Sequence, residues 1–195
     1  MKNEKIKRMV SIALLMALVL IMQMLSGIIP PIGGFSISLV LIPIVMGAVL
    51  FGPSAGAFLG ATFGAIVYIN CITGADPGGA MVFHADPVLC FLVVMGKGML
   101  AGLASGWVYR LMSHWNAHVA MLCAAIICPV FNTGVFVACM LTIFPDVLSV
   151  WAEGGDVIAY VLTGLILANF VPELIINIVF GTAGHTIMHV VKKTK

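Results

Sequence analysis

The sequence has little charge. Only 8% of its 195 residues are Asp, Glu, Lys or Arg, whereas 62% are apolar and the mean hydropathy is +1.20. Soluble domains carry about 25% charged residues, so this chain cannot coat a globule of its size with charge. The net charge of +2 is too small to indicate a nucleic-acid-binding protein. The composition excludes a large soluble catalytic domain.

Motifs of common enzymes are also missing. The sequence contains no Walker lysine loop, GxSxG, HExxH or Gly-rich dinucleotide turn. Two HxxxH pairs are present, but neither has a supporting Asp or Glu, so an interfacial role is favoured over a metal site. These pairs are His114 with His118 and His185 with His189. We therefore expect no catalytic residue, no metal and no cofactor.

Cysteines are few and do not pair in sequence. The five have no CxxC motif and lie mostly in apolar runs, so we expect reduced side chains that pack as small hydrophobes. They are Cys71, Cys90, Cys123, Cys128 and Cys139.

Long apolar runs dominate what remains, and they predict an all-α membrane protein. One domain over residues 1–195 would form a bundle of six transmembrane helices. The expected helices cover 8–29, 36–51, 54–71, 88–112, 118–144 and 158–187. The first run has no small-residue cleavage site, so we expect it to be a retained span. The segments from Thr73 to Pro87 and from Pro145 to Asp156 are predicted loops.

The few charges are segregated. Basic residues fall at the two ends of the chain and at Arg110, whereas the two predicted loops contain only acidic ones. The positive-inside rule then predicts that both termini are cytoplasmic, which agrees with an even number of spans. The acidic loops would face the exterior, where they could cover a site.

Small residues at four-residue spacing predict close helix packing. One stripe lies in the third expected helix and one in the fourth: Gly52, Gly56, Gly60 and Gly64, then Gly98, Gly102 and Gly106. We expect these stripes to pack within the chain. The pair Ala13 and Ala17 stands alone among bulky residues, so it would either pack inside the chain or dock a partner helix.

Two charges remain inside the predicted spans, Lys97 and Glu173. A charge at membrane depth costs at least about 2.5–3.5 kcal/mol, so it normally faces a cavity or a partner. The amides of Asn132 and Asn169 and the hydroxyl of Thr133 come to similar depths. Asn169, Glu173 and Asn177 are spaced four residues apart and share one helix face. These residues predict a polar, outward-opening pocket for a small ligand with a carboxylate, which Lys97 would bind. The alternative is a structural Lys97–Glu173 ion pair.

Prolines stand beside these polar positions. Pro129 and Pro172 lack the N–H that would bond the carbonyl four residues earlier. The freed carbonyls need a polar cavity or a neighbouring helix to satisfy them.

Several of these motifs together resemble the substrate-binding S components of energy-coupling-factor (ECF) vitamin transporters, most of all the pantothenate-type branch. The similarity covers nearly the whole chain. Its motifs are the small pair Ala13-xxx-Ala17, the GPxxGAxxG turn from Gly52 to Gly60, FxxDP from Phe83 to Pro87, Asn132-Thr133, and NxxxE at Asn169 and Glu173. The branch more often has Asn where this chain has Asp86.

The resemblance implies a function that composition does not. Such proteins capture a vitamin from outside a prokaryotic cell and deliver it with a membrane coupling protein and two cytoplasmic ATPases. Ala13 and Ala17 would face the coupling protein, and Phe83 and Asp86 would join the substrate-binding residues. A metal substrate is not expected, because the N-terminal Met-His segment of the cobalt and nickel members is absent.

Three functions remain open from sequence alone. The leading interpretation is an S component for pantothenate or another carboxylate-bearing vitamin, with riboflavin or lipoate as alternatives. An autonomous small secondary carrier is the second, although no internal duplication supports it. A small membrane enzyme using His or Cys is the third.

Overall fold

A computed structural model describes residues 2–28 and 38–181, and every secondary-structure element in these ranges is helical. The elements are α1 (Lys2–Ile28), α2 (Leu41–Phe51), α3 (Pro53–Thr73), α4 (Pro77–Ala85), α5 (Pro87–Met112), α6 (Ala117–Thr142), α7 (Pro145–Trp151), α8 (Val157–Tyr160) and the π-helix η1 (Val161–Phe170). An α-helix follows over 171–181. The predicted all-α class is confirmed.

Five helices are long and apolar enough to cross a membrane: Glu4–Ser26, Pro53–Thr73, Pro87–Met112, Ala117–Thr142 and Val157–Gly181. They match five of the six predicted spans. The second prediction, 36–51, is corrected, because α2 has only 11 residues. At 1.5 Å per residue it is roughly 16 Å long, about half of a bilayer core.

The two predicted loops are also corrected, since each contains a short helix, α4 or α7. Both helices begin with a proline at their first position, Pro77 and Pro145. Proline is favoured there because its missing N–H has no partner to lose and its φ already suits a helix. Only the flanking residues of each segment form loop structure.

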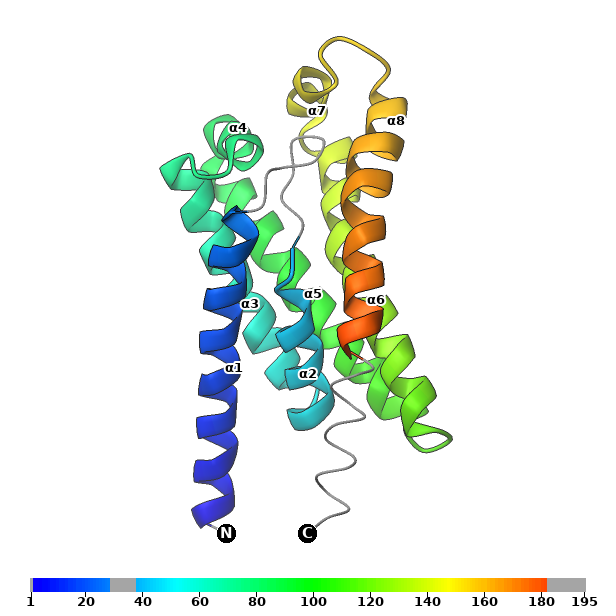
Figure 1. Ribbon diagram of the computed structural model, residues 1–195. Helices are drawn as coiled ribbons and strands as arrows, with labels where there is room; N and C mark the ends of the chain where they lie inside the picture. Colours follow the sequence, from blue (N-terminus) through cyan, green and yellow to red (C-terminus); the bar gives the residue numbers. More distant parts are fainter. Residues whose placement is uncertain (1, 29–37, 182–195) are drawn as a thin grey trace.

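The long helices stand side by side, and α4 and α7 lie together at one end (Figure 1). This end carries the acidic residues between α3 and α5 and between α6 and α8. The start of α1, with Lys5, Lys7 and Arg8, lies at the opposite end with the end of α5, which contains Arg110. The described charges are therefore segregated as the sequence predicts; Lys192, Lys193 and Lys195 lie outside the described residues.

Glycines set the close antiparallel contact between α3 and α5. A Cβ on Gly60 would meet the carbonyl of Gly98, and a Cβ on Gly56 would meet that of Gly102. One turn further, a Cβ on Gly64 would lie 2.7 Å from the Val94 oxygen. The predicted packing within the chain is confirmed for both stripes except at Gly52, which precedes α3 and has nothing within 4 Å.

This contact gives a test of the helix seam. Gly98→Ala should destabilise the protein, because its methyl group overlaps the Gly60 carbonyl; overpacking of this kind costs about 1–3 kcal/mol. Gly96→Ala, two residues away on α5, meets open space and should be neutral or stabilising. Thermal unfolding in detergent measures both. Equal unfolding temperatures for the two variants would contradict the close α3–α5 contact.

α1 is attached to the bundle by specific contacts at both ends. Near its start, the Arg8 guanidinium donates to the carbonyl of Phe51, the last residue of α2, over 3.0 Å. Near its end, the Ser26 hydroxyl accepts from the Leu39 N–H over 3.2 Å. Most of α1 nevertheless faces outward: Met9, Leu14 and Met24 are 71%, 67% and 75% exposed.

Ala13 and Ala17 lie on this same outward face of α1, and both are exposed. Their methyl groups are smaller than the exposed side chains of Met9, Leu14 and Met24 on the same helix. Within the described residues, the pair does not serve helix packing inside the chain.

Candidate functional site

A cavity lies between the helices near the end that carries α4. Its volume is about 120 Å³, counted as the space that the centre of a water molecule can occupy. One water needs roughly 10–15 Å³ by this measure, so the space is large enough for a small organic molecule. Its polar lining comes from most of the long helices: Gln23, Ser26, Ser38, Asn70, Asp76, Lys97, Asn132, Thr133, Asn169 and Glu173.

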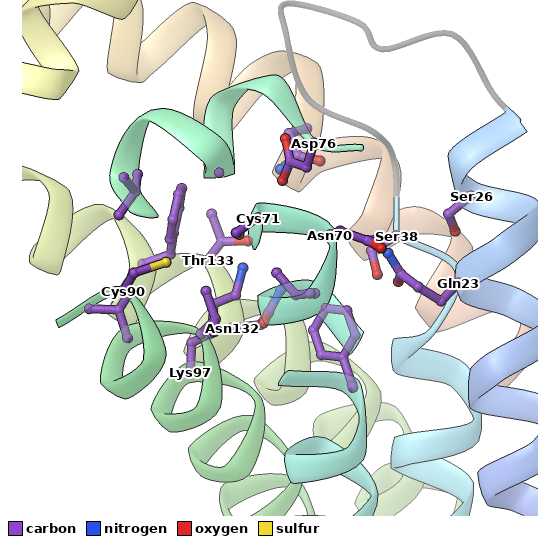
Figure 2. Close-up of a pocket in the computed structure, with 18 of the residues that line it drawn as sticks. Gln23, Ser26, Ser38, Asn70, Cys71, Asp76, Cys90, Lys97, Asn132 and Thr133 are labelled. Carbon is purple, nitrogen blue, oxygen red and sulfur yellow. The ribbon is translucent and has the colours of Figure 1, made fainter. Parts of the chain in front are cut away.

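Lys97 supplies the positive charge of the cavity. Its side chain extends from α5 into the space (Figure 2), and Nζ lies 4.5 Å from the ring centre of Phe136 and 5.8 Å from that of Phe63. Aromatic faces attract a cation, but they leave its three N–H donors without acceptors. Within the described residues, no hydrogen bond or ion pair joins Lys97 to another side chain.

Glu173 supplies a carboxylate to the same cavity. The residue is 2% exposed, and its Oε2 accepts a hydrogen bond from the Thr133 hydroxyl at 3.5 Å. Its other oxygen, Oε1, has no hydrogen-bond partner in the part of the chain that the structure describes. Lys97 and Glu173 both lie within the described residues, and no contact of 4.0 Å or less joins their charged groups, so the alternative of a direct Lys97–Glu173 ion pair is not observed.

Five buried polar atoms of the cavity lining, Glu173 Oε1 among them, have no hydrogen-bond partner within the described residues. They are Gln23 Oε1, Ser38 Oγ, Asn132 Oδ1, Asn169 Oδ1 and Glu173 Oε1. A buried polar atom without a hydrogen bond costs about 1–3 kcal/mol, so folded proteins rarely keep five of them around one space. Water or a polar ligand must satisfy them. A ligand that fits would offer an anionic group to Lys97 and several donors to these oxygens.

The structure brings five predicted site residues together around this cavity: Lys97, Asn132, Thr133, Asn169 and Glu173. They come from α5, α6, η1 and the following helix, so residues up to 76 positions apart converge (97 to 173). The predicted shared pocket is present as geometry. Substrate binding by these residues stays a prediction.

Three predicted site residues do not line the cavity. Asp86 instead caps α5, because its Oδ1 accepts from the Val88 and Leu89 N–H groups, each at 2.9 Å. Phe83 packs edge to face against Tyr68, with ring centres 5.8 Å apart. Asn177 is 1% exposed and turns toward α6.

Asn177 has a structural partner that explains its burial. Its Nδ2 donates to the Ala125 carbonyl over 3.0 Å. Ala125 precedes Pro129 by four residues, so proline leaves this carbonyl without its helical N–H donor. The predicted need for a neighbouring helix to satisfy such a carbonyl is confirmed at Pro129.

We therefore expect substitutions at Asn177 and Asn169 to have opposite effects on stability and on ligand binding. Asn177→Ala should lower the free energy of unfolding by about 1–3 kcal/mol, because it orphans a buried carbonyl, and it should leave ligand affinity of the folded protein unchanged. Asn169→Ala should weaken ligand binding with little loss of stability. Thermal unfolding and equilibrium binding on both variants check this. The reverse pattern would remove Asn169 from the site.

Sequence reasoning missed other lining residues. Asp76, immediately before α4, and Asn70, near the end of α3, both reach the cavity (Figure 2). Gln23 is the single amide side chain in the long apolar run of α1. This isolated polar residue could have indicated from the sequence that it lines a polar cavity. Ser38 carried no such signal, since its place depends on how α1 and α2 pack.

Comparison with known proteins identifies the family of the chain. The chain is 22% identical over 194 residues to the pantothenic acid transporter PanT of Lactococcus lactis subsp. cremoris (strain MG1363), covering 94% of each protein. The family of ECF transporter substrate-specific components matches residues 7–182. That match spans nearly the whole helical bundle and every described cavity residue. The chain therefore belongs to the family of substrate-specific components of ECF transporters, proteins of the prokaryotic plasma membrane with several membrane-spanning helices.

Proposed function

We propose that this S component captures a small, carboxylate-bearing vitamin from outside the cell, with pantothenate as the first candidate. Family membership supports vitamin uptake through an ECF transporter, and the relative PanT, by its name, transports pantothenic acid. In this proposal the chain binds the vitamin and delivers it to the transporter complex, while two partner ATPases hydrolyse ATP. It has no catalytic residue of its own.

The observation that carries the proposal is the unpaired ammonium of Lys97 beside a set of unpartnered oxygens. A lysine buried in a membrane protein without a counter-ion is costly, and a carboxylate ligand would supply that counter-ion. The remaining oxygens would accept hydrogen bonds from hydroxyl and amide groups. Pantothenate has one carboxylate, two hydroxyls and one amide N–H, which match both parts of the cavity.

Each site residue then has a role in the proposal. Lys97 binds the carboxylate, and Asn132, Asn169 and Glu173 accept from the donors of the ligand. Thr133 orients Glu173, because it already donates to Oε2. Phe83, Asp86 and Asn177 act indirectly, by packing, by capping α5 and by holding α6.

The cavity would load from the exterior. It lies near α4, at the end where the described acidic residues gather, and the positive-inside rule places that end outside the cell. Both termini would then be cytoplasmic. The outward-facing pair Ala13 and Ala17 would contact the membrane coupling protein.

Binding measurements on the purified full-length chain test this function. Mass spectrometry of the bound fraction and titrations with pantothenate, riboflavin, lipoate, biotin, folate and thiamine identify the ligand. We expect pantothenate to bind with a dissociation constant of about 1 μM or lower, near −8 kcal/mol. Tighter binding of another vitamin would reassign the substrate. Uptake by this chain alone in liposomes would instead indicate a secondary carrier.

A further inference from the structure

Two cysteines in the cavity wall have no role in the proposed ligand binding. Cys71 lies near the end of α3 and Cys90 near the start of α5, and both line the cavity as free, buried thiols (Figure 2). Both belong to the same buried core, where Cys71 is 2% and Cys90 0% exposed. The other cysteines, Cys123, Cys128 and Cys139, all lie on α6 and do not line the cavity.

The helix register explains why these two thiols meet. The contacts between Gly56 and Gly102, Gly60 and Gly98, and Gly64 and Val94 advance by four residues on each helix. Cys90 continues the stripe of Gly98 and Val94 on α5. Cys71 lies seven residues after Gly64, two turns along the same face of α3.

The antiparallel direction of the helices then brings the sulfur atoms toward each other. Side chains on an α-helix lean toward its N-terminus. Cys71 on α3 therefore leans back toward the level of Cys90, and Cys90 on α5 leans toward the level of Cys71. Cys71 Sγ also packs against α4, since a Cβ built on Gly79 would lie 2.5 Å from the sulfur.

The pair also brackets α4. A bond between the two sulfurs would close a segment of 20 residues, 71–90, that contains α4 and the cavity-lining residues Asp76, Gly79 and Val82. A cysteine on each side of one short helix at the mouth of a cavity can fix how far that helix moves.

We propose that Cys71 and Cys90 form a peroxide-sensitive dithiol site that closes to a disulfide at the base of α4. One thiol takes an oxygen atom from a peroxide, becomes a sulfenic acid and releases water or the corresponding alcohol. The second thiol attacks that sulfur, the S–S bond forms and a water leaves. Together the two thiols lose two hydrogen atoms, which is a two-electron oxidation of sulfur. The same two electrons reduce the peroxide. The bond restrains α4 and slows exchange of whatever the cavity holds.

The experiment uses the unmodified full-length protein treated with hydrogen peroxide, followed by alkylation and peptide mass spectrometry. We expect a cross-linked peptide that joins Cys71 to Cys90, lighter by two hydrogen atoms, and loss of alkylation at these two residues. Cys123, Cys128 and Cys139 should still be alkylated. A reducing agent should restore both thiols. Independent alkylation of Cys71 and Cys90 after oxidation, with no cross-link, would overturn the proposal.

Two further measurements complete the test. The thermal unfolding midpoint should rise on oxidation and return on reduction, because a cross-link restricts the unfolded chain. Cys71→Ser and Cys90→Ser should each abolish both the cross-link and the rise. A rise that persists in either variant would contradict the assignment. These readouts need no ligand, so they remain valid if pantothenate does not bind.

Discussion

Replacing Lys97 by methionine is expected to weaken pantothenate binding by about 10- to 150-fold. Methionine keeps much of the length and apolar surface of the side chain but removes the ammonium group, which lies 4.5 Å from the centre of the Phe136 ring. A hydrogen bond to a charged group contributes about 1.5–3 kcal/mol, and each 1.4 kcal/mol is a tenfold change in affinity. Equilibrium titration of the purified variant measures the effect.

A neutral ligand makes this prediction specific to the carboxylate. The alcohol analogue of pantothenate replaces the carboxylate with a hydroxymethyl group and keeps the other donors. Wild-type protein should prefer pantothenate strongly, whereas Lys97→Met should bind both ligands with similar, weak affinity. Lys97→Arg should retain part of the preference, since it keeps the charge but changes its geometry. An unchanged preference in folded Lys97→Met would show that Lys97 does not contact the carboxylate.

Replacing Ala13 or Ala17 by tryptophan is expected to abolish ATP-driven uptake while leaving vitamin binding intact. Both alanines lie on the outward face of α1 and outside the cavity lining, so a large side chain there leaves the site unchanged. It would hinder the contact that we propose with the coupling protein, because small residues allow helices to approach closely. Binding is measured on the isolated chain and uptake in proteoliposomes that contain the complete ECF complex.

A matched control separates the partner surface from the lipid-facing surface. Ala138 is an exposed alanine on α6, so Ala138→Trp makes the same change elsewhere on the bundle. We expect this control to bind and transport normally. Normal uptake by Ala13→Trp and Ala17→Trp would exclude this face of α1 as the coupling surface. Equal loss in all three variants would indicate general disruption.

Much of the cavity could be predicted because charge inside a membrane span is rarely incidental. Lys97 and Glu173 are isolated charges within long apolar runs, and the cost of burying them indicated a shared polar space. Helix periodicity then selected Asn169, four residues before Glu173. The same periodicity also selected Asn177, wrongly for the cavity, because the carbonyl freed by Pro129 offered it a closer partner on α6.

Other features depend on packing that the sequence does not express locally. The segment between α3 and α5 reads as a loop because glycine and proline dominate it, yet Pro77 begins a helix there. Ser38 reaches the cavity only through the way α1 and α2 pack against each other and against α3. Similarly, the π-helix η1 widens the turn around Asn169 just before Pro172, which periodicity at 3.6 residues per turn cannot anticipate.

The most direct test of the account is an experimental structure of the chain with pantothenate bound. We predict the carboxylate within hydrogen-bonding distance of Lys97 Nζ, about 2.7–2.9 Å, and the hydroxyl and amide donors directed at Asn132, Asn169 and Glu173. The oxygens that lack partners in the protein would then have them. A carboxylate placed away from Lys97, or a ligand bound outside this cavity, would contradict the account.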